Sequence, residues 1–186
     1  MAFFRTDGTA DIEQKKFYRD NGTADVQIDK IYRGNGTVDS LIYTAETVVV
    51  DTSQGVPVNT WKAAGYNDQS QQYTGSASAT EGITLRVDNN YGGYTEQVAR
   101  DFTNVDRITF VVSSRSAIND RLGTTTFGVS NKSNGQPYGG ASWKKSMNVS
   151  SAGTFTLDTS DIEGTGYLAL YQSVGGKVNM TKIVFE

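Results

Sequence analysis

The sequence predicts an all-β protein in which repeated β-hairpins precede a jelly-roll-like β-sandwich. Glycine is frequent, with 20 residues, and proline is rare, with 2, in a chain of 186 residues. Short runs of alternating apolar and polar residues, rich in Thr, Val, Ser and Tyr, recur between clusters of Gly, Asn, Asp and Ser, which is the pattern of strands and turns. A 14-residue repeat at the start divides the chain into two predicted domains, residues 1–43 and 44–186.

The N-terminal repeat has three copies, FFRTDGTADIEQKK (3–16), FYRDNGTADVQIDK (17–30) and IYRGNGTVDSLIY (31–43). Each copy contains Asp-Gly or Asn-Gly, which tolerates the positive φ angles of a type I′ turn, so each is predicted to form a tight hairpin. Residues that flank such a turn face each other across the hairpin. The predicted pairs are Arg19 with Ala24, Tyr18 with Asp25 and Phe17 with Val26.

These hairpins are expected to need a partner. Ordering the segment costs about 1.5 kcal/mol per residue, and six short strands bury little apolar surface to offset it. The partner is a neighbouring copy in a stack, the same segment of other subunits, or a large particle; the alternative is a meander that packs back on the following domain. We predict an anchor that forms a homo-oligomer, a trimer. The residues assigned to anchoring and oligomerisation are Phe3, Arg5, Phe17, Tyr18, Arg19, Val26, Ile31, Tyr32 and Arg33.

Residues 44–186 are predicted to form the two sheets of the sandwich. The predicted strands are TVVVD (47–51), VNTWKAAG (58–65), YTGSASAT (73–80), ITLRVD (83–88), YTEQVAR (94–100), RITFVVSSR (107–115), TTTFGVSN (124–131), ASWKKSMNV (141–149), GTFTLD (153–158), YLALYQS (167–173) and KVNMTKIVFE (177–186). The segment SVGG (173–176) predicts a final hairpin and SDIEG (160–164) a turn across the end of the sandwich. No helix of any length is expected.

Charge and composition argue against several classes of function. The net charge is −3 and no Lys/Arg run exceeds two residues, so neither nucleic acid nor a membrane is an expected partner. No export signal is visible, and a soluble protein is expected. The absence of Cys and His removes thiolate nucleophiles, the commonest general base and the commonest metal ligand. We therefore expect a non-enzymatic protein with no catalytic residues, no bound metal and no cofactor.

Several predicted loops combine aromatic rings with amide and carboxylate groups. The C–H face of a sugar ring stacks on Trp or Tyr, while its hydroxyls need Asp, Asn, Gln or Arg partners. Such loops at one end of a sandwich are expected to line a saccharide groove. The candidate glycan-binding residues are Tyr66, Asn67, Asp68, Asp88, Asn90, Tyr91, Tyr94, Asn134 and Tyr138.

Other readings of these segments remain open. Trp61 and Trp143 lie in predicted strands, where packing in the core is the commoner role. In YLALYQS, Tyr167 and Tyr171 share one parity and the two leucines the other, so at least one set is expected in the core. The run Asp88, Asn89 and Asn90 offers oxygens for a structural calcium but equally describes a polar turn.

Two segments resemble proteins of tailed bacteriophages. KIYRGNGTVDSLIYTAE (30–46) resembles Lys-Ile-Tyr-x-Gly…Leu-Ile-Tyr segments that lead into or out of adhesion modules in phages of Gram-positive bacteria. GTFTLDTSDIEGTGYLALYQ (153–172) is similar to the carbohydrate-binding-like jelly-roll domains of phage tail, neck and head-fibre proteins. The resemblance implies a virion protein, assembled in the host cytoplasm and attached to other virion proteins, with a lectin-like domain for host cell-wall polysaccharide.

Three functions follow in order of preference. The first is a virion adhesion protein, anchored through residues 1–43, whose weak sites gain avidity from multivalent display. The second is a capsid decoration or connector protein with protein contacts only and no glycan binding. The third, a depolymerase or glycosidase, is disfavoured by the absence of His.

Overall fold

The computed structural model describes residues 17–20, 25–28, 30–34, 39–44, 47–65, 73–133 and 142–186, with side chains in 47–63, 73–133 and 142–186. The chain divides into two compact units, residues 1–47 with Glu186, and Val48–Phe185. Within the described ranges the regular structure is β-strand, and no α-helix occurs. The predicted all-β class is confirmed.

Two antiparallel hairpins are described in the N-terminal unit. Strand β1 (Phe17–Asp20) pairs with β2 (Asp25–Ile28), and β3 (Lys30–Gly34) pairs with β4 (Asp39–Thr44). The predicted register is wrong, because Arg19 pairs with Val26 rather than with Ala24. Four residues, not two, separate the paired ends Asp20 and Asp25, so every cross-strand pair shifts by two positions.

The first copy of the repeat, including Phe3 and Arg5, lies outside the described residues. Phe17, Tyr18, Arg19, Val26, Ile31, Tyr32 and Arg33 lie on the strands of the two hairpins. Their assigned role in anchoring and oligomerisation stays a prediction.

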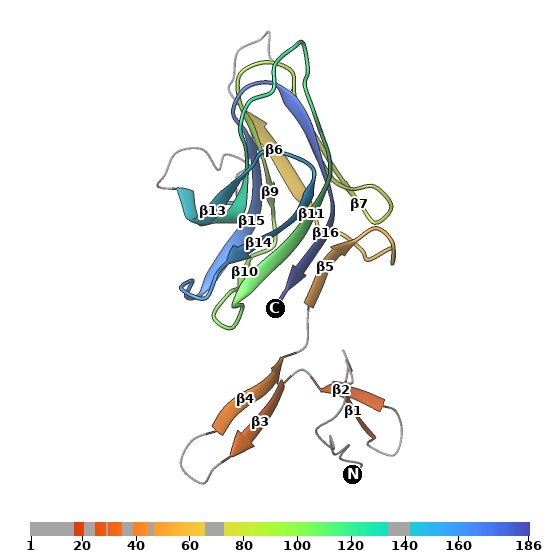
Figure 1. Cartoon of the computed structure of the whole chain (residues 1–186), viewed down its shortest axis with the longest axis vertical. Helices are drawn as coiled ribbons and strands as arrows, with labels where there is room; N and C mark the ends of the chain where they lie inside the picture. The colour runs from red at the N-terminus through yellow and green to blue at the C-terminus, as the bar shows by residue number, and fades with distance from the viewer. Residues whose placement is uncertain are drawn as a thin grey trace. The chain divides into compact units, whose positions relative to one another are not determined.

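The second unit is a sandwich of two antiparallel sheets (Figure 1). The first sheet, called the front sheet as a name and not for its place in Figure 1, has the order β13 (Trp143–Val149), β12 (Thr125–Ser130), β15 (Thr165–Gln172), β9 (Gly92–Glu96) and β6 (Trp61–Gly65), with β10 (Arg100–Asp101) also paired to β15. The back sheet has the order β14 (Gly153–Asp158), β11 (Arg107–Ser116), β16 (Gly176–Phe185), β8 (Gly82–Val87) and β7 (Tyr73–Ser78), with β5 (Thr47–Asp51) also paired to β16.

Alternate residues of both sheets fill the core between them. Phe110 of the back sheet meets Phe127 of the front sheet with ring centroids 4.3 Å apart, and Phe155 stacks on Phe110 at 5.5 Å. Trp61 is buried and lies 5.3 Å from the ring of Tyr94. The core role expected of Trp61 is therefore confirmed.

One end of the sandwich, which we call the tip, is built by turns that bond to one another. The turn before β9 meets the turn before β16, where the Gly175 amide donates to the Asn90 carbonyl at 3.2 Å. The Gly123 amide, in the segment between β11 and β12, donates to the Val174 carbonyl at 2.6 Å. Strand β6 also ends and β7 begins at the tip, which lies opposite the C-terminus (Figure 1).

Candidate functional site

The outer face of the front sheet carries aromatic side chains. In β15, Leu168 and Leu170 are fully buried in the core, and alternation along the strand places Tyr167 and Tyr171 on the outer face, where both are half-buried. This settles the alternative that the sequence left open: the leucines are the core set. The two tyrosines are four residues apart, which corresponds to about 13 Å along the strand.

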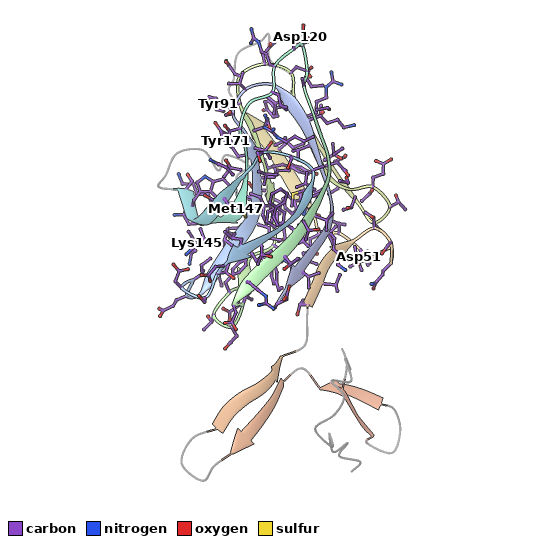
Figure 2. The ribbon with its side chains drawn as sticks, in the orientation of Figure 1. Asp51, Tyr91, Asp120, Lys145, Met147 and Tyr171 are labelled. Carbon is purple, nitrogen blue, oxygen red and sulfur yellow. The ribbon has the colours of Figure 1, made fainter. Side chains whose placement is uncertain are left out.

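Tyr171 stands in a row of side chains that runs across the sheet toward its β13 edge. The rings of Tyr91 and Tyr171 have centroids 6.2 Å apart and an interplanar angle of 41°, and Figure 2 shows the two residues close together. Thr126 of β12 pairs with Tyr171 of β15 on one side and with Asn148 of β13 on the other. The Thr126 hydroxyl donates to Asn148 Oδ1 at 2.9 Å. This bond uses the amide oxygen of Asn148, and the two N–H donors of its NH₂ group take no part in it.

A second aromatic position lies farther from the tip. Tyr167 pairs with Ser130, and Ser130 pairs with Trp143 beyond a bulge in β13. Trp143 is half-buried, in contrast to Trp61. We call the set Tyr91, Thr126, Trp143, Asn148, Tyr167 and Tyr171 the tyrosine face.

Small residues separate the two aromatic positions. Gly128 and Ala169 pair with each other between them and are buried. A Cβ at Gly128 would lie 2.6 Å from Ser146 Cα of β13, so a glycine is needed where the β13 backbone approaches.

Three of the predicted glycan-binding residues lie together in the turn between β8 and β9. Asp88 accepts a hydrogen bond from Arg86 Nε at 2.7 Å, Asn90 is exposed, and Tyr91 joins the tyrosine face through Tyr171. Within the described ranges no group of three His, Cys, Asp or Glu residues could hold a metal ion. Asp88 forms an ion pair with Arg86.

Tyr94, predicted as a glycan-binding residue, is instead buried in the core. Gly92 and Gly93 belong to β9 rather than to the preceding turn, so Tyr94 falls on the inward parity and is 5% exposed. Its ring occupies the space beside Gly75, where an added Cβ would lie 2.5 Å from the ring. Burial raises the pKa of the Tyr94 hydroxyl.

The remaining predicted residues, Tyr66, Asn67, Asp68, Asn134 and Tyr138, lie outside the described residues. The tyrosine face contains five side chains outside the predicted glycan-binding set, Thr126, Trp143, Asn148, Tyr167 and Tyr171. The alternation in YLALYQS was the available signal for the two tyrosines. Nothing in the sequence brings Thr126 and Asn148 beside them, because strand order does.

The chain is similar to some solved structures at low sequence identity. No protein-family model and no curated protein matches the sequence. Among solved structures, the chain is similar to a low-affinity xylan-binding module from Roseburia intestinalis, at 12% identity over 76% of this chain and 95% of that chain, with a TM-score of 0.45. It is also similar to a family 11 carbohydrate-binding module from Clostridium thermocellum in complex with a β-1,3-1,4-mixed-linked tetrasaccharide, at 13% identity over 75% of this chain and 94% of that chain, with a TM-score of 0.46.

A third similar structure is a family 29 carbohydrate-binding module from Piromyces equi, at 12% identity over 76% of this chain and 89% of that chain, with a TM-score of 0.37.

The predicted place of the chain in a phage particle stays a prediction from the sequence. In the described part of the chain, no helix has the length and apolar character needed to cross a membrane.

Proposed function

We propose that the sandwich unit is a non-catalytic carbohydrate-binding module that holds a polysaccharide on the tyrosine face. The observation that carries the proposal is the row in which the rings of Tyr91 and Tyr171, 6.2 Å apart, lie beside Thr126 and the exposed Asn148. Aromatic rings stack on the apolar C–H face of a sugar, and hydroxyl and amide groups bond its hydroxyls. The row therefore supplies both kinds of contact.

The spacing of the rings favours a chain of sugars over a single sugar. Tyr167 lies about 13 Å along β15 from Tyr171, and both side chains are on the same face of the strand. A polysaccharide that follows the strand would meet an aromatic ring at both positions. The proposed contacts are stacking and hydrogen bonding, and the tyrosine face contains no pair of carboxylates of the kind that cleaves glycosidic bonds.

Replacement of Tyr171 by alanine tests this function. We expect at least about a tenfold loss of affinity, equivalent to about 1.4 kcal/mol and near the lower end of what burial of a large side chain contributes. Tyr171→Phe keeps the ring and is expected to bind within about threefold of the wild type, a difference under 1 kcal/mol. Affinity electrophoresis against a panel of soluble neutral and acidic polysaccharides measures the retardation.

Thr156→Ala, an exposed position on the outer face of the back sheet, is the control and should bind like the wild type. Equal retardation of Tyr171→Ala and the wild type would show that the ligand does not use the tyrosine face. A wild-type protein that binds no polysaccharide of the panel would favour the decoration or connector function, with protein contacts only.

We further propose that residues 1–43 tether this jelly-roll-type sandwich to a phage particle as a homotrimer, so that weak sites act together on host-surface glycan. The support is the sequence resemblance of residues 30–46 and the small size of the hairpins. Deletion of residues 1–43 is expected to convert the oligomer to a monomer in light scattering coupled to size exclusion. A truncated protein that keeps the full oligomer would refute the tether.

A further inference from the structure

Arg115 spans the two sheets near the tip of the sandwich. It belongs to β11 of the back sheet, and its Nε donates to the Thr125 hydroxyl of the front sheet at 2.8 Å. Its Nη1 donates to the Ser150 carbonyl at 3.0 Å, and its Nη2 donates to the Gly123 carbonyl. Acceptors on two stretches of the chain, residues 123–125 and Ser150, thus fix the guanidinium in one orientation.

The positive charge of Arg115 has no negative partner among the described residues. All three acceptors are neutral, and no described carboxylate lies within 4.0 Å of the guanidinium nitrogens. A guanidinium has five N–H donors, so two remain beyond these bonds. Burial lowers the pKa of the Arg115 guanidinium, which remains protonated at any physiological pH.

An open cavity of about 440 Å³ lies against this side chain. Thr124, Asn148, Ser150 and Ser173 contribute to its wall together with Arg115. We call it the Arg115 pocket. Leu122 and Val149 add apolar surface to the wall. The hydroxyl, amide and backbone groups around the single cation form the part of the wall that suits an oxyanion.

The Arg115 pocket adjoins the tyrosine face. Asn148 belongs to both, because its Oδ1 accepts from Thr126 in the row of Tyr171 while the residue also lines the cavity. A chain of sugars that follows β15 past Tyr171 would also reach the cavity, because Ser173, directly after that strand, lines it. The two surfaces meet at Asn148, near the tip ends of β12 and β13.

We propose that the Arg115 pocket binds an oxyanion carried by the polysaccharide, a carboxylate or a phosphate, and that the ligand class is therefore an acidic polysaccharide. This inference rests on the proposed function of the tyrosine face. The remaining guanidinium donors would form charge-assisted hydrogen bonds to the oxyanion, which are stronger than those between neutral groups. The fixed orientation of Arg115 means that little side-chain freedom is lost on binding.

Ser150→Asp provides the sharpest test, because it places a carboxylate in the pocket and leaves the three bonds of Arg115 to backbone and Thr125 in place. Ser151→Asp is the matched control, since it adds the same charge one residue away at an exposed position that does not line the pocket. Both variants and the wild type would be titrated with polygalacturonate, phosphomannan and neutral β-1,3-1,4-glucan at low and high NaCl. Melting temperatures of all three proteins verify folding.

We expect the wild type to bind at least one acidic polysaccharide about tenfold or more tightly than the neutral glucan, with an affinity that falls as NaCl rises. Ser150→Asp should lose that preference and keep its affinity for the neutral glucan, whereas Ser151→Asp should match the wild type. Polygalacturonate and phosphomannan distinguish carboxylate from phosphate. Equal binding of all three polysaccharides, or equal behaviour of the two variants, would overturn the inference and leave the proposed function standing. Failure to bind any of them would overturn both.

Discussion

Replacement of Arg100 by methionine is expected to lower the free energy of unfolding by about 3 to 5 kcal/mol, the usual consequence of leaving one member of a buried ion pair alone. The Glu96 side chain is fully buried and accepts bonds from Arg100 Nε at 2.7 Å and Nη2 at 2.6 Å. Among the residues that the structure describes, Asn59 Nδ2, at 2.7 Å, would still donate to the carboxylate in the variant. Methionine retains apolar contact with the ring of Phe185, over which Arg100 lies.

The partner variant Glu96→Gln serves as the comparison. It should be less destabilising, because the Arg100 side chain is 20% exposed and its charge can turn toward water, whereas the Glu96 carboxylate cannot. Urea denaturation of both single variants and the double variant measures the coupling, and the double variant should lose less than the sum of the single losses. A smaller loss for Arg100→Met than for Glu96→Gln would show that water reaches Glu96.

Substitution of Gly82 by alanine is expected to lower the free energy of unfolding by about 2 to 5 kcal/mol, as the sum of left-handed backbone strain of about 1 to 2 kcal/mol and overpacking of about 1 to 3 kcal/mol. Gly82 has φ +76° at the start of β8, and an added Cβ would overlap the Met180 carbonyl of β16. A backbone oxygen in the middle of a sheet cannot move aside as a flexible side chain can.

Gly55→Ala separates the two contributions. Gly55 has φ +63°, and no atom lies within 4 Å of its added Cβ, so only the backbone strain of about 1 to 2 kcal/mol applies. Thermal and urea unfolding of the two variants should therefore differ by the overpacking contribution. Equal losses would mean that β8 and β16 separate at that point without cost.

Sequence alternation separated the two faces of a long strand but did not say which face is buried. In β15 the parity of YLALYQS set the leucines apart from the tyrosines, and the structure buries Leu168 and Leu170 and gives Tyr167 and Tyr171 to the outer face. Alternation failed at Tyr94, because the preceding glycine pair resembles a turn in the sequence but forms part of β9. Because the glycines belong to the strand, Tyr94 takes a fixed face of the sheet instead of an exposed position beside a turn.

Long-range pairing is what the sequence could not predict. Asn148 is connected to Tyr171 through Thr126 of the strand between them, and Arg115 bonds three groups that are 8 to 35 residues away in the chain. Neither arrangement leaves a local pattern, since each depends on the order of strands in the sheets. The hairpin register failed for a related reason: Asn-Gly indicates where the chain turns, but the number of residues in the loop decides which residues pair.

The two tryptophans lie in different environments, so the intrinsic fluorescence of the protein can report on both its folding and its ligand binding. Trp61 is packed against Tyr94 in the core, so its fluorescence follows the integrity of the sandwich. Trp143, half-buried beside the β13 bulge, is the indole that a molecule on the sheet surface would approach. Emission at the two sites thus separates unfolding from occupancy in a single unlabelled sample.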